Sequence, residues 1–319
     1  MKTKKKNVSD IIQEYGALIA LVVLVVVIGA ISPEFRTVNN FLSLIRQSSI
    51  NGFIAFGMTM VILTGGIDLS VGSTLALSAA LCAGMITKIG IPVPLAMLIT
   101  LVFGLILGGI SGVLITKGRL QPFIATLITM TVYRGLTMIY MDGRPISNLS
   151  NDEFVMPRAL VFFGKGSIAG IPVPVILFVI AFVIFFIILN KTTMGRKIYA
   201  VGSNDKCAVL AGISITKVKL AVYSISGLMA ALSGLVLLSR LNSAQPTLGD
   251  GYELDAIASV ALGGTSMNGG RGKVTGTLIG ILIIAVLNNG LNILGISSYY
   301  QDVVKGLVIL VAVLSDKNR

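Results

Sequence analysis

Apolar residues gather along this chain in long, nearly uninterrupted runs, with glycine-rich or charged segments between them. A helix that crosses a bilayer needs about 20 consecutive, mostly apolar residues. Most of the runs approach that length, and the run at 253–264 is shorter and starts with acidic residues. The pattern predicts an all-α, polytopic membrane protein of about ten transmembrane helices. We expect them at residues 17–32, 43–64, 69–87, 93–116, 122–141, 171–189, 220–239, 253–264, 274–289 and 300–314.

The scarcity of charge supports this prediction. Of the 319 residues, 55% are hydrophobic and only 12% are charged, whereas soluble domains carry roughly 25% charged residues. So few charges cannot cover the exterior of a soluble fold. The net charge of +12 would favour nucleic-acid binding in a soluble protein, but the placement of the cations gives a different explanation.

Cytoplasmic loops of membrane proteins are enriched in Lys and Arg. If the chain starts in the cytoplasm and crosses the membrane ten times, most of its 25 Lys and Arg residues fall on the cytoplasmic side, including those at both ends. This distribution explains the basic charge without nucleic acid, and it keeps the short run at 253–264 as a tenth span. The MKTKKK start and the apolar run after it resemble a signal peptide, but Pro33 follows the possible cleavage site directly. We therefore expect a retained first helix.

Two polar segments are long enough to carry a function within a single transmembrane domain of residues 1–319. They are an external loop at 142–170 and a basic cytoplasmic loop at 190–219. In the second loop, Asn204 is a suitable amino-terminal cap for a short helix over residues 205–211, and Gly212 suits its end. Such a helix would present Leu210 on a polar loop. It would either dock on a partner protein or lie on the membrane surface.

Glycine spacing predicts where helices approach one another closely. Residues four apart stack on one helix face, and small faces let helices pack tightly in lipid. A second glycine pattern is an echo between GGIDLSVG at 65–72 and GGTSMNGG at 263–270. Interrupted helices at matching places in two halves of a transporter point to its pathway. The glycines with four-residue spacing are Gly104, Gly108 and Gly112, and Gly272, Gly276 and Gly280.

Polar side chains in or beside the spans are candidates for a transport pathway, because a charge at mid-bilayer costs about 2.5–3.5 kcal/mol on insertion scales. Asp68 opens a span, so it is either a helix cap or a pathway residue. Glu253 and Asp255 open the short span. Three amides near the outer end of another span could bind hydroxyl groups without titrating, or could join helices; they are Asn288, Asn289 and Asn292.

One cation, Arg134, lies inside a predicted span. Charged side chains in such positions face the interior of the bundle, where they pair with other charges or with backbone carbonyls. We expect Arg134 to have a carboxylate or carbonyl partner and a structural role.

The chain lacks the groups that enzymes and metal sites require. It has no His, and its two cysteines, Cys82 and Cys207, are far apart in the sequence. Neither a His-based catalytic group nor a metal site is expected. No GxxxxGK[ST] motif is present, so the chain is not expected to bind ATP by that device. We expect no enzyme activity, no catalytic residue, no metal and no cofactor.

Four long motifs carry a family resemblance. They are ILTGGIDLSVGS, KGRLQPFIATLITMTVYRGLTMIY, SRLNSAQPTLGDGYELDAIASVALGGTSMNGGRGKVTGTLIG and LNNGLNILGISSYYQ. These motifs resemble the ribose-type sugar permeases of bacterial ABC importers, and the resemblance covers essentially the whole chain.

The resemblance implies an architecture and a set of partners. Such permeases have about ten spans in the type II fold of vitamin B12-type importers, and two copies enclose one pathway through the bacterial plasma membrane. A cytoplasmic ABC ATPase docks on them, and an extracytoplasmic sugar-binding protein delivers the substrate, most often ribose for this motif set. Both termini are cytoplasmic. The family's ATPase-coupling segment matches Gly202, Asn204, Asp205, Leu210 and Gly212, which favours the docking alternative, although residues 206–209 depart from the usual pattern.

The alternative is a secondary sugar or nucleoside transporter, or a facilitator, that is not coupled to ATP. A proton-coupled carrier would be expected to hold a relay of buried titratable groups. The few candidate acids of this chain fall near span ends. We therefore expect alternating access that the partner ATPase drives.

Overall fold

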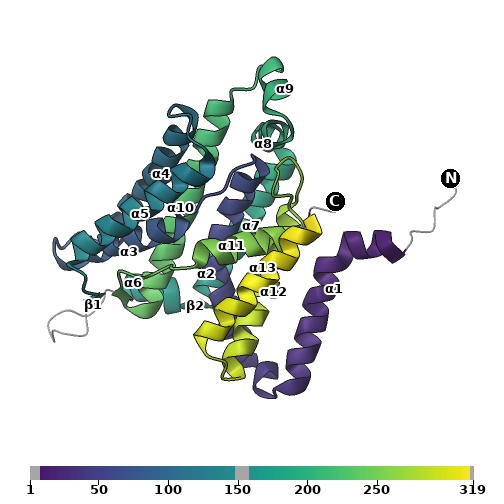
Figure 1. Cartoon of the computed structure of the whole chain (residues 1–319). Helices are drawn as coiled ribbons and strands as arrows, with labels where there is room; N and C mark the ends of the chain where they lie inside the picture. Colours follow the sequence, from purple (N-terminus) through teal and green to yellow (C-terminus); the bar gives the residue numbers. More distant parts are fainter. Residues whose placement is uncertain (1–7, 148–157, 317–319) are drawn as a thin grey trace.

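The computed structural model describes residues 8–147 and 158–316. Within these ranges the chain forms a bundle of thirteen α-helices, one 3-10 turn (η1, Glu34–Arg36) and a few two-residue strands (Figure 1). The helices are α1 (Val8–Ile31), α2 (Val38–Leu63), α3 (Val71–Thr87), α4 (Val93–Thr116), α5 (Pro122–Met141), α6 (Arg158–Lys165), α7 (Val173–Lys191), α8 (Thr193–Ser203), α9 (Asp205–Leu210), α10 (Ile215–Leu241), α11 (Tyr252–Leu262), α12 (Val274–Ile293) and α13 (Ser298–Asp316).

Five helices in the described ranges are long and apolar enough to cross a membrane, namely α4, α5, α7, α10 and α12. Shorter apolar stretches lie in α1 and α3. The predicted spans at 93–116 and 122–141 coincide with α4 and α5, and every other predicted span overlaps a helix. The described residues are therefore mostly helical, and the apolar helices agree with the predicted polytopic membrane protein.

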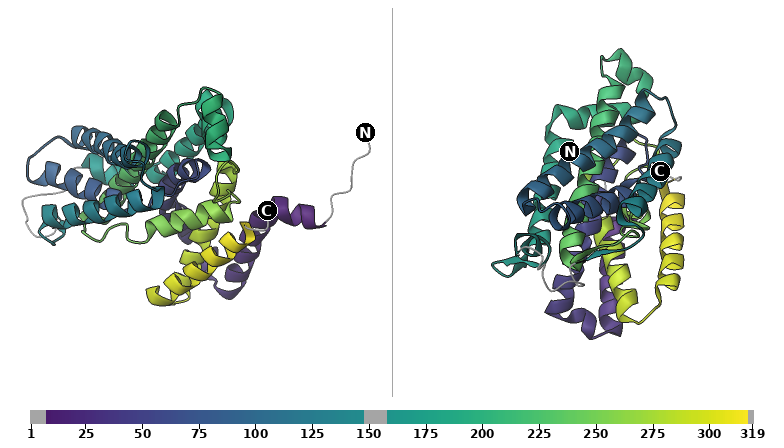
Figure 2. Two further views of the ribbon diagram at one scale, coloured as in Figure 1. Left: turned by 45° about the horizontal axis from the view of Figure 1, so that its top comes forward. Right: turned by 90° about the vertical axis from the view of Figure 1, so that its left-hand side faces the viewer.

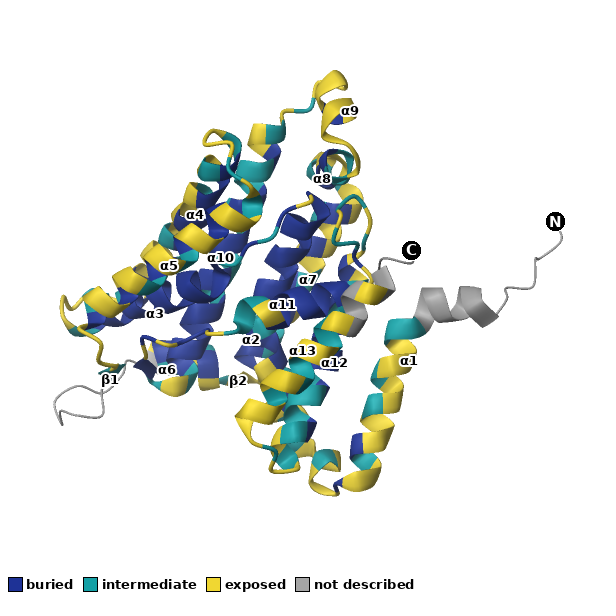
Figure 3. Ribbon diagram, viewed as in Figure 1, coloured by how far each residue is buried: buried dark blue, intermediate teal, exposed yellow. Residues whose placement is uncertain are grey.

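The core of the bundle forms around α10, which packs against α4, α2 and α3. The second half of α2 is buried, and its Phe56 stacks on Phe178 of α7 with ring centroids 5.2 Å apart. Figure 3 shows this buried centre with exposed residues on the outer helices. Many of the exposed side chains are large and apolar, such as Ile139 on α5 and Val179 on α7. Lipid contact makes that distribution favourable, because hydrocarbon chains are as apolar as these side chains.

Five of the six glycines with four-residue spacing lie at close helix contacts, as predicted. The prediction for Gly272 is wrong, because this residue precedes α12 and lies against the side chain of Thr265 in the loop. A Cβ atom on Gly108 of α4 would overlap the backbone of Tyr223 on α10, and one on Gly280 of α12 would overlap the backbone of Ser259 on α11. These faces therefore join α4 to α10 and α12 to α11.

Two interrupted helices distinguish the centre of the fold. Helix α3 begins only at Val71, after a non-helical segment from 64 to 70. Helix α11 has 11 residues, which at 1.5 Å per residue makes about 16 Å, roughly half of the hydrocarbon thickness. The short helix predicted at 253–264 is therefore present, but α11 is too short to cross the membrane by itself, and the tenth crossing stays a prediction.

The loop at 263–273 extends the path of α11 to the end of α2. The amide of Gly270 donates to the carbonyl of Leu63 at 3.0 Å, and Gly269 lies against Gly65. The two echoed glycine segments are thus in direct contact, and each adjoins an interrupted helix. The sequence echo predicted interrupted helices, and the tertiary fold places them together.

The loop at 142–170 is partly structured in its described residues. Strand β1 (Ile146–Ser147) pairs antiparallel with β4 (Ser243–Ala244), and β2 (Ser167–Ile168) pairs with β3 (Ile171–Pro172). Helix α6 lies in the same region, while α8 and α9 lie at the opposite end of the bundle (Figures 1 and 2). The basic residues at the chain ends that set the predicted orientation, such as Lys2 and Lys317, lie outside the described residues.

Candidate functional site

The loop at 190–219, predicted to be cytoplasmic and to dock a partner, contains the projecting helix α9, at the tip of the bundle in Figure 1. The Asn204 side-chain oxygen accepts from the Cys207 amide at 3.0 Å, so Asn204 caps the helix as predicted. Gly212 has φ +77°, a left-handed conformation that glycine adopts without strain. Leu210 is 88% exposed, and Asp205 pairs with Lys219 of α10 at 3.5 Å. The loop therefore presents an apolar side chain on a short, capped helix.

Helix α8 supports this loop and was not predicted from the sequence. Its cap, Thr192, accepts from the Gly195 amide, and Ile198 and Val201 are buried on one face. A Cβ atom on Gly202 would overlap the backbone of Leu63 at the end of α2. Gly202, a predicted coupling residue, is therefore in contact with the core helix and does not form part of the exposed tip. A two-turn amphipathic pattern after Thr192 was the signal available in the sequence.

Asp68 lies in the non-helical segment before α3 and is 1% exposed. Its Oδ1 accepts from the amide and the hydroxyl of Ser70, at 3.0 and 2.6 Å. Its Oδ2 accepts from the hydroxyl of Ser226 on α10 at 2.8 Å. Asp68 was predicted to be either a helix cap or a pathway residue, and its bond to the Ser70 amide just before α3 is of the capping kind. The carboxylate also joins this segment to α10. Its place in the pathway stays a prediction.

Asp255 and Glu253 both lie in the first turn of α11 and have different surroundings. The Asp255 carboxylate is buried and accepts from the Asn51 amide of α2 at 3.1 Å. It also forms an ion pair with Lys305 of α13, with 3.3 Å between Nζ and Oδ1. Glu253 is half-buried next to Gly72, at the start of α3. Asp255 therefore links three helices, while Glu253 lies where the two interrupted helices meet.

The three predicted asparagines of α12 divide into two kinds. Asn289 exchanges a pair of amide hydrogen bonds with Asn40 of α2, at 3.0 and 2.9 Å. Asn292 accepts from the side chain of Gln301 on α13 at 2.9 Å. These two join helices. The Asn288 side chain also forms a hydrogen bond with Asp255 of α11, but its Oδ1 is buried and has no hydrogen-bond partner.

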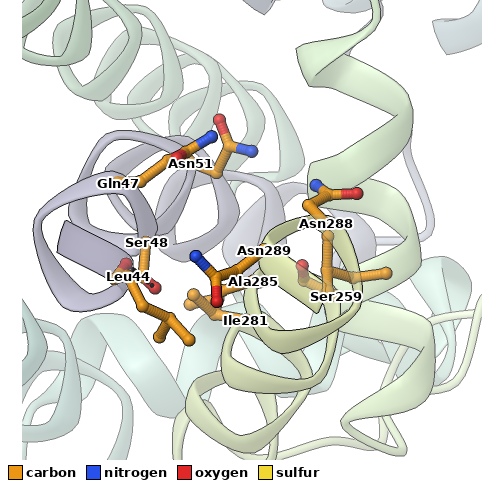
Figure 4. Close-up of a pocket in the computed structure, with 10 residues that line it drawn as sticks. Leu44, Gln47, Ser48, Asn51, Ser259, Ile281, Ala285, Asn288 and Asn289 are labelled. Atoms are coloured by element: carbon orange, nitrogen blue, oxygen red, sulfur yellow. Dashed lines mark hydrogen bonds between the residues drawn. The ribbon is translucent and has the colours of Figure 1, made fainter. Parts of the chain in front are cut away.

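A cavity of about 20 Å³ lies between α2, α11 and α12, beside Asn288 (Figure 4). Its rim carries amides from two helices, and its other walls are apolar or small. In Figure 4 the side chains of Gln47 and Asn51 approach it from α2, and Asn288 and Ser259 lie on the opposite side. The lining residues are Leu44, Gln47, Ser48, Asn51, Ser259, Ile281, Ile284, Ala285, Asn288 and Asn289.

Comparison with known proteins decides the kind of protein to which this site belongs. Residues 40–313 match the permease family described as "Branched-chain amino acid transport system / permease component". The chain belongs to this permease family. The ribose import permease protein RbsC of Bacillus subtilis (strain 168) is 55% identical to it, over 100% of this chain and 98% of the relative. RbsC of Haemophilus influenzae is 50% identical, over 99% and 97%.

A third permease is more distant and carries a different name. The D-allose transport system permease protein AlsC of Escherichia coli (strain K12) is 41% identical, over 95% of this chain and 91% of the relative. No solved structure matches the chain. Members of this permease family are transport components and not catalytic enzymes, and the apolar helices agree with a multi-pass membrane protein. The matched region includes every candidate pathway residue and the whole docking loop, whereas α1 precedes it.

The expected structural role of Arg134 in this permease is confirmed. Its Nη1 donates to the carbonyls of Pro246 and Leu248, at 2.6 and 2.9 Å, and its Nη2 pairs with Asp250. Arg134 therefore ties α5 to the turn that precedes α11, with both of the expected kinds of partner.

Two polar residues that contact Asp255 were not predicted from the sequence, namely Asn51 and Lys305. Both lie inside predicted spans, where a polar side chain is costly unless it is paired. That rule singled out Arg134 and applies equally to Lys305. Asn51 follows a polar stretch at the start of a predicted span, and nothing local distinguishes it from an amide that faces a neighbouring backbone.

Proposed function

We propose that this chain is the membrane-spanning permease subunit of an ATP-driven ABC importer for ribose. One observation carries the proposal: over their full lengths, the chain is 50% to 55% identical to two permeases named for ribose import. The permease named for D-allose has lower identity, at 41%. Ribose is therefore the favoured substrate.

The proposal assigns the use of ATP to a partner. A cytoplasmic ABC ATPase binds the loop at 190–219, and α9 inserts its exposed Leu210 into that ATPase. The cap at Asn204, the turn at Gly212 and the support from α8 at Gly202 hold α9 in a fixed orientation, while Asp205 attaches it to α10. Closure of the ATPase is transmitted to the bundle through this contact. An extracytoplasmic sugar-binding protein delivers ribose at the opposite end, where the loop at 142–170 lies.

The membrane arrangement is also part of the proposal. Two copies of the permease enclose one pathway in the bacterial inner membrane, in the type II fold with both termini cytoplasmic. The tenth crossing is the half-length helix α11 together with the loop at 263–273. This count keeps Lys317 and Arg319 on the cytoplasmic side, which the distribution of cations favours.

The pathway is proposed to follow the polar cluster of α2, α11, α12 and α13. Polar side chains at membrane depth face the bundle interior or a water-filled cavity. Glu253, Asp255 and Asn288 are its central members, Asn289 and Asn292 hold the adjoining helices, and Asp68 positions α3. The interrupted helices supply the elements that move, because irregular backbone in a membrane is tolerated where it lines such a cavity.

The test is uptake of labelled ribose into proteoliposomes that contain the permease, its ATPase and its binding protein. Uptake is expected only with ATP and with all three components. Proteoliposomes that contain the permease alone, with a ribose gradient and no ATP, are the control. If these accumulated or equilibrated ribose as fast as the complete system, the chain would be a facilitator and not an ABC permease.

A further inference from the structure

The cavity between α2, α11 and α12 contains an acceptor without a donor. The Oδ1 atom of Asn288 is buried and makes no hydrogen bond, although Asn288 lines the cavity. An unpaired buried polar atom is costly, because it has lost its hydrogen bonds to water without replacing them. Natural structures rarely keep such an atom unless a water or a ligand supplies the missing partner.

The other polar wall supplies donors. Asn51 and Gln47 lie four residues apart on α2 and both line the cavity, so their amides share one helix face. A group placed between the two walls has to donate to Asn288 and accept from α2. A hydroxyl group does both, whereas a carboxylate cannot donate and an ammonium cannot accept.

The size of the cavity limits what enters it. A volume of about 20 Å³ is close to that of one water-sized group. A whole sugar does not fit, but one hydroxyl of a sugar that passes along the helices does. Entry is from the side of Gln47, whose side chain is exposed.

We propose that Asn288, Asn51 and Gln47 form a subsite that binds one hydroxyl group of the sugar during its passage. The proposal rests on the sugar-import function above and deepens it, because it assigns a position where the permease itself recognises a hydroxyl group of its substrate. Asn51 also donates to Asp255 at 3.1 Å, and Asp255 is paired with Lys305. The subsite therefore adjoins, through Asn51, the ion pair that joins α11 to α13.

The experiment compares ribose with its mono-deoxy analogues in the complete system of permease, ATPase and binding protein. The import rate of each analogue is first corrected for its affinity for the binding protein. Wild type is then expected to import one analogue roughly three- to tenfold less efficiently than the others, because one hydrogen bond contributes about 0.5–1.5 kcal/mol. In Asn288→Leu, which has a similar volume and no polar atom, that particular penalty disappears, while import of ribose falls by the same factor. Asn51→Leu is expected to remove the penalty for the same analogue.

The control is Asn190→Leu on α7, an exposed residue whose amide donates to the carbonyl of Phe186 and does not line the cavity. It leaves the pattern of analogue preferences unchanged. If wild type imported all analogues equally, or if Asn288→Leu and Asn51→Leu kept the wild-type preferences, the cavity would hold a resident water only and the proposal would be overturned. Loss of ATP-dependent ribose import in the wild-type system would instead contradict the proposed function, so the two failures are distinguishable.

Discussion

Lys305 of α13 and Asp255 of α11 form an ion pair inside the bundle. The distance from Nζ to Oδ1 is 3.3 Å, and the Asp255 side chain is 5% exposed. Asp302 also lies near Lys305, at 3.9 Å, but its side chain is 76% exposed. Exposed pairs contribute little, so the pair with Asp255 is the one that holds α13 in place.

Removal of Lys305 alone should destabilise the protein. Lys305→Met leaves the buried Asp255 carboxylate without its cationic partner, and breaking a buried pair in this way costs about 3–5 kcal/mol. Thermal unfolding of the solubilised protein should show a midpoint well below that of wild type. Asp302→Asn is the control and should unfold near the wild-type midpoint. Equal midpoints for the two variants would show that the pair with Asp255 contributes nothing.

Cys207 should report both the orientation of the chain and the docking of the ATPase. It is exposed on α9, whereas the other cysteine, Cys82, is buried in α3. A membrane-impermeant maleimide should therefore label Cys207 in inside-out vesicles and not in intact cells. Binding of the ATPase should slow the labelling at least several-fold. Cys207→Ser, which removes the accessible thiol, should abolish labelling; labelling of intact cells would contradict the proposed topology.

Leu210→Asp should separate ATP hydrolysis from transport. The side chain is 88% exposed, so the substitution removes no packing within the permease and the protein should still insert and fold. A charge at the proposed contact has no partner there, and an unpaired buried charge is strongly unfavourable. Ribose uptake should fall at least tenfold while the assembled ATPase still hydrolyses ATP, or assembly itself should fail in a pull-down. Wild-type coupling of uptake to hydrolysis would remove the docking role of α9.

Gly108→Val should disrupt the bundle. A Cβ atom at this position overlaps the backbone of Tyr223, and overpacking of this kind costs roughly 1–3 kcal/mol or more. The yield of folded, monodisperse protein in size-exclusion chromatography measures the effect. Gly135→Val on α5 is the control, because a Cβ atom there meets nothing within 4 Å. Similar yields for both variants would contradict the close contact of α4 with α10.

Asp68→Ala should impair transport more than membrane insertion. The carboxylate joins the segment before α3 to Ser226 of α10, so its loss frees an interrupted helix without removing an apolar contact. Ser226→Ala should show a weaker effect in the same direction, since Ser70 still binds the carboxylate. Insertion is measured by the amount of protein in washed membranes and transport by ribose uptake. Equal loss of both in Asp68→Ala would favour a purely structural role.

Much of this protein is determined by the sequence alone. Runs of apolar residues place the helices, because crossing a bilayer requires a minimum length of apolar chain. The four-residue glycine spacing predicted the contacts of Gly108 and Gly280, since a helix repeats its face every four residues. Local chemistry also predicted the cap at Asn204 and the left-handed turn at Gly212, because caps and turns depend on neighbouring residues only.

Tertiary structure decided the rest, because it depends on which helices meet. The contact between the two echoed glycine segments and the bond from Asp68 to Ser226 involve residues that are far apart in the chain. Asn288, Asn289 and Asn292 are chemically identical and nearly adjacent, yet the amide oxygens of Asn289 and Asn292 bond to neighbouring helices, and the amide oxygen of Asn288 lies beside a cavity without a hydrogen-bond partner. No sequence pattern separates them, since each amide's role is set by what a neighbouring helix places opposite it.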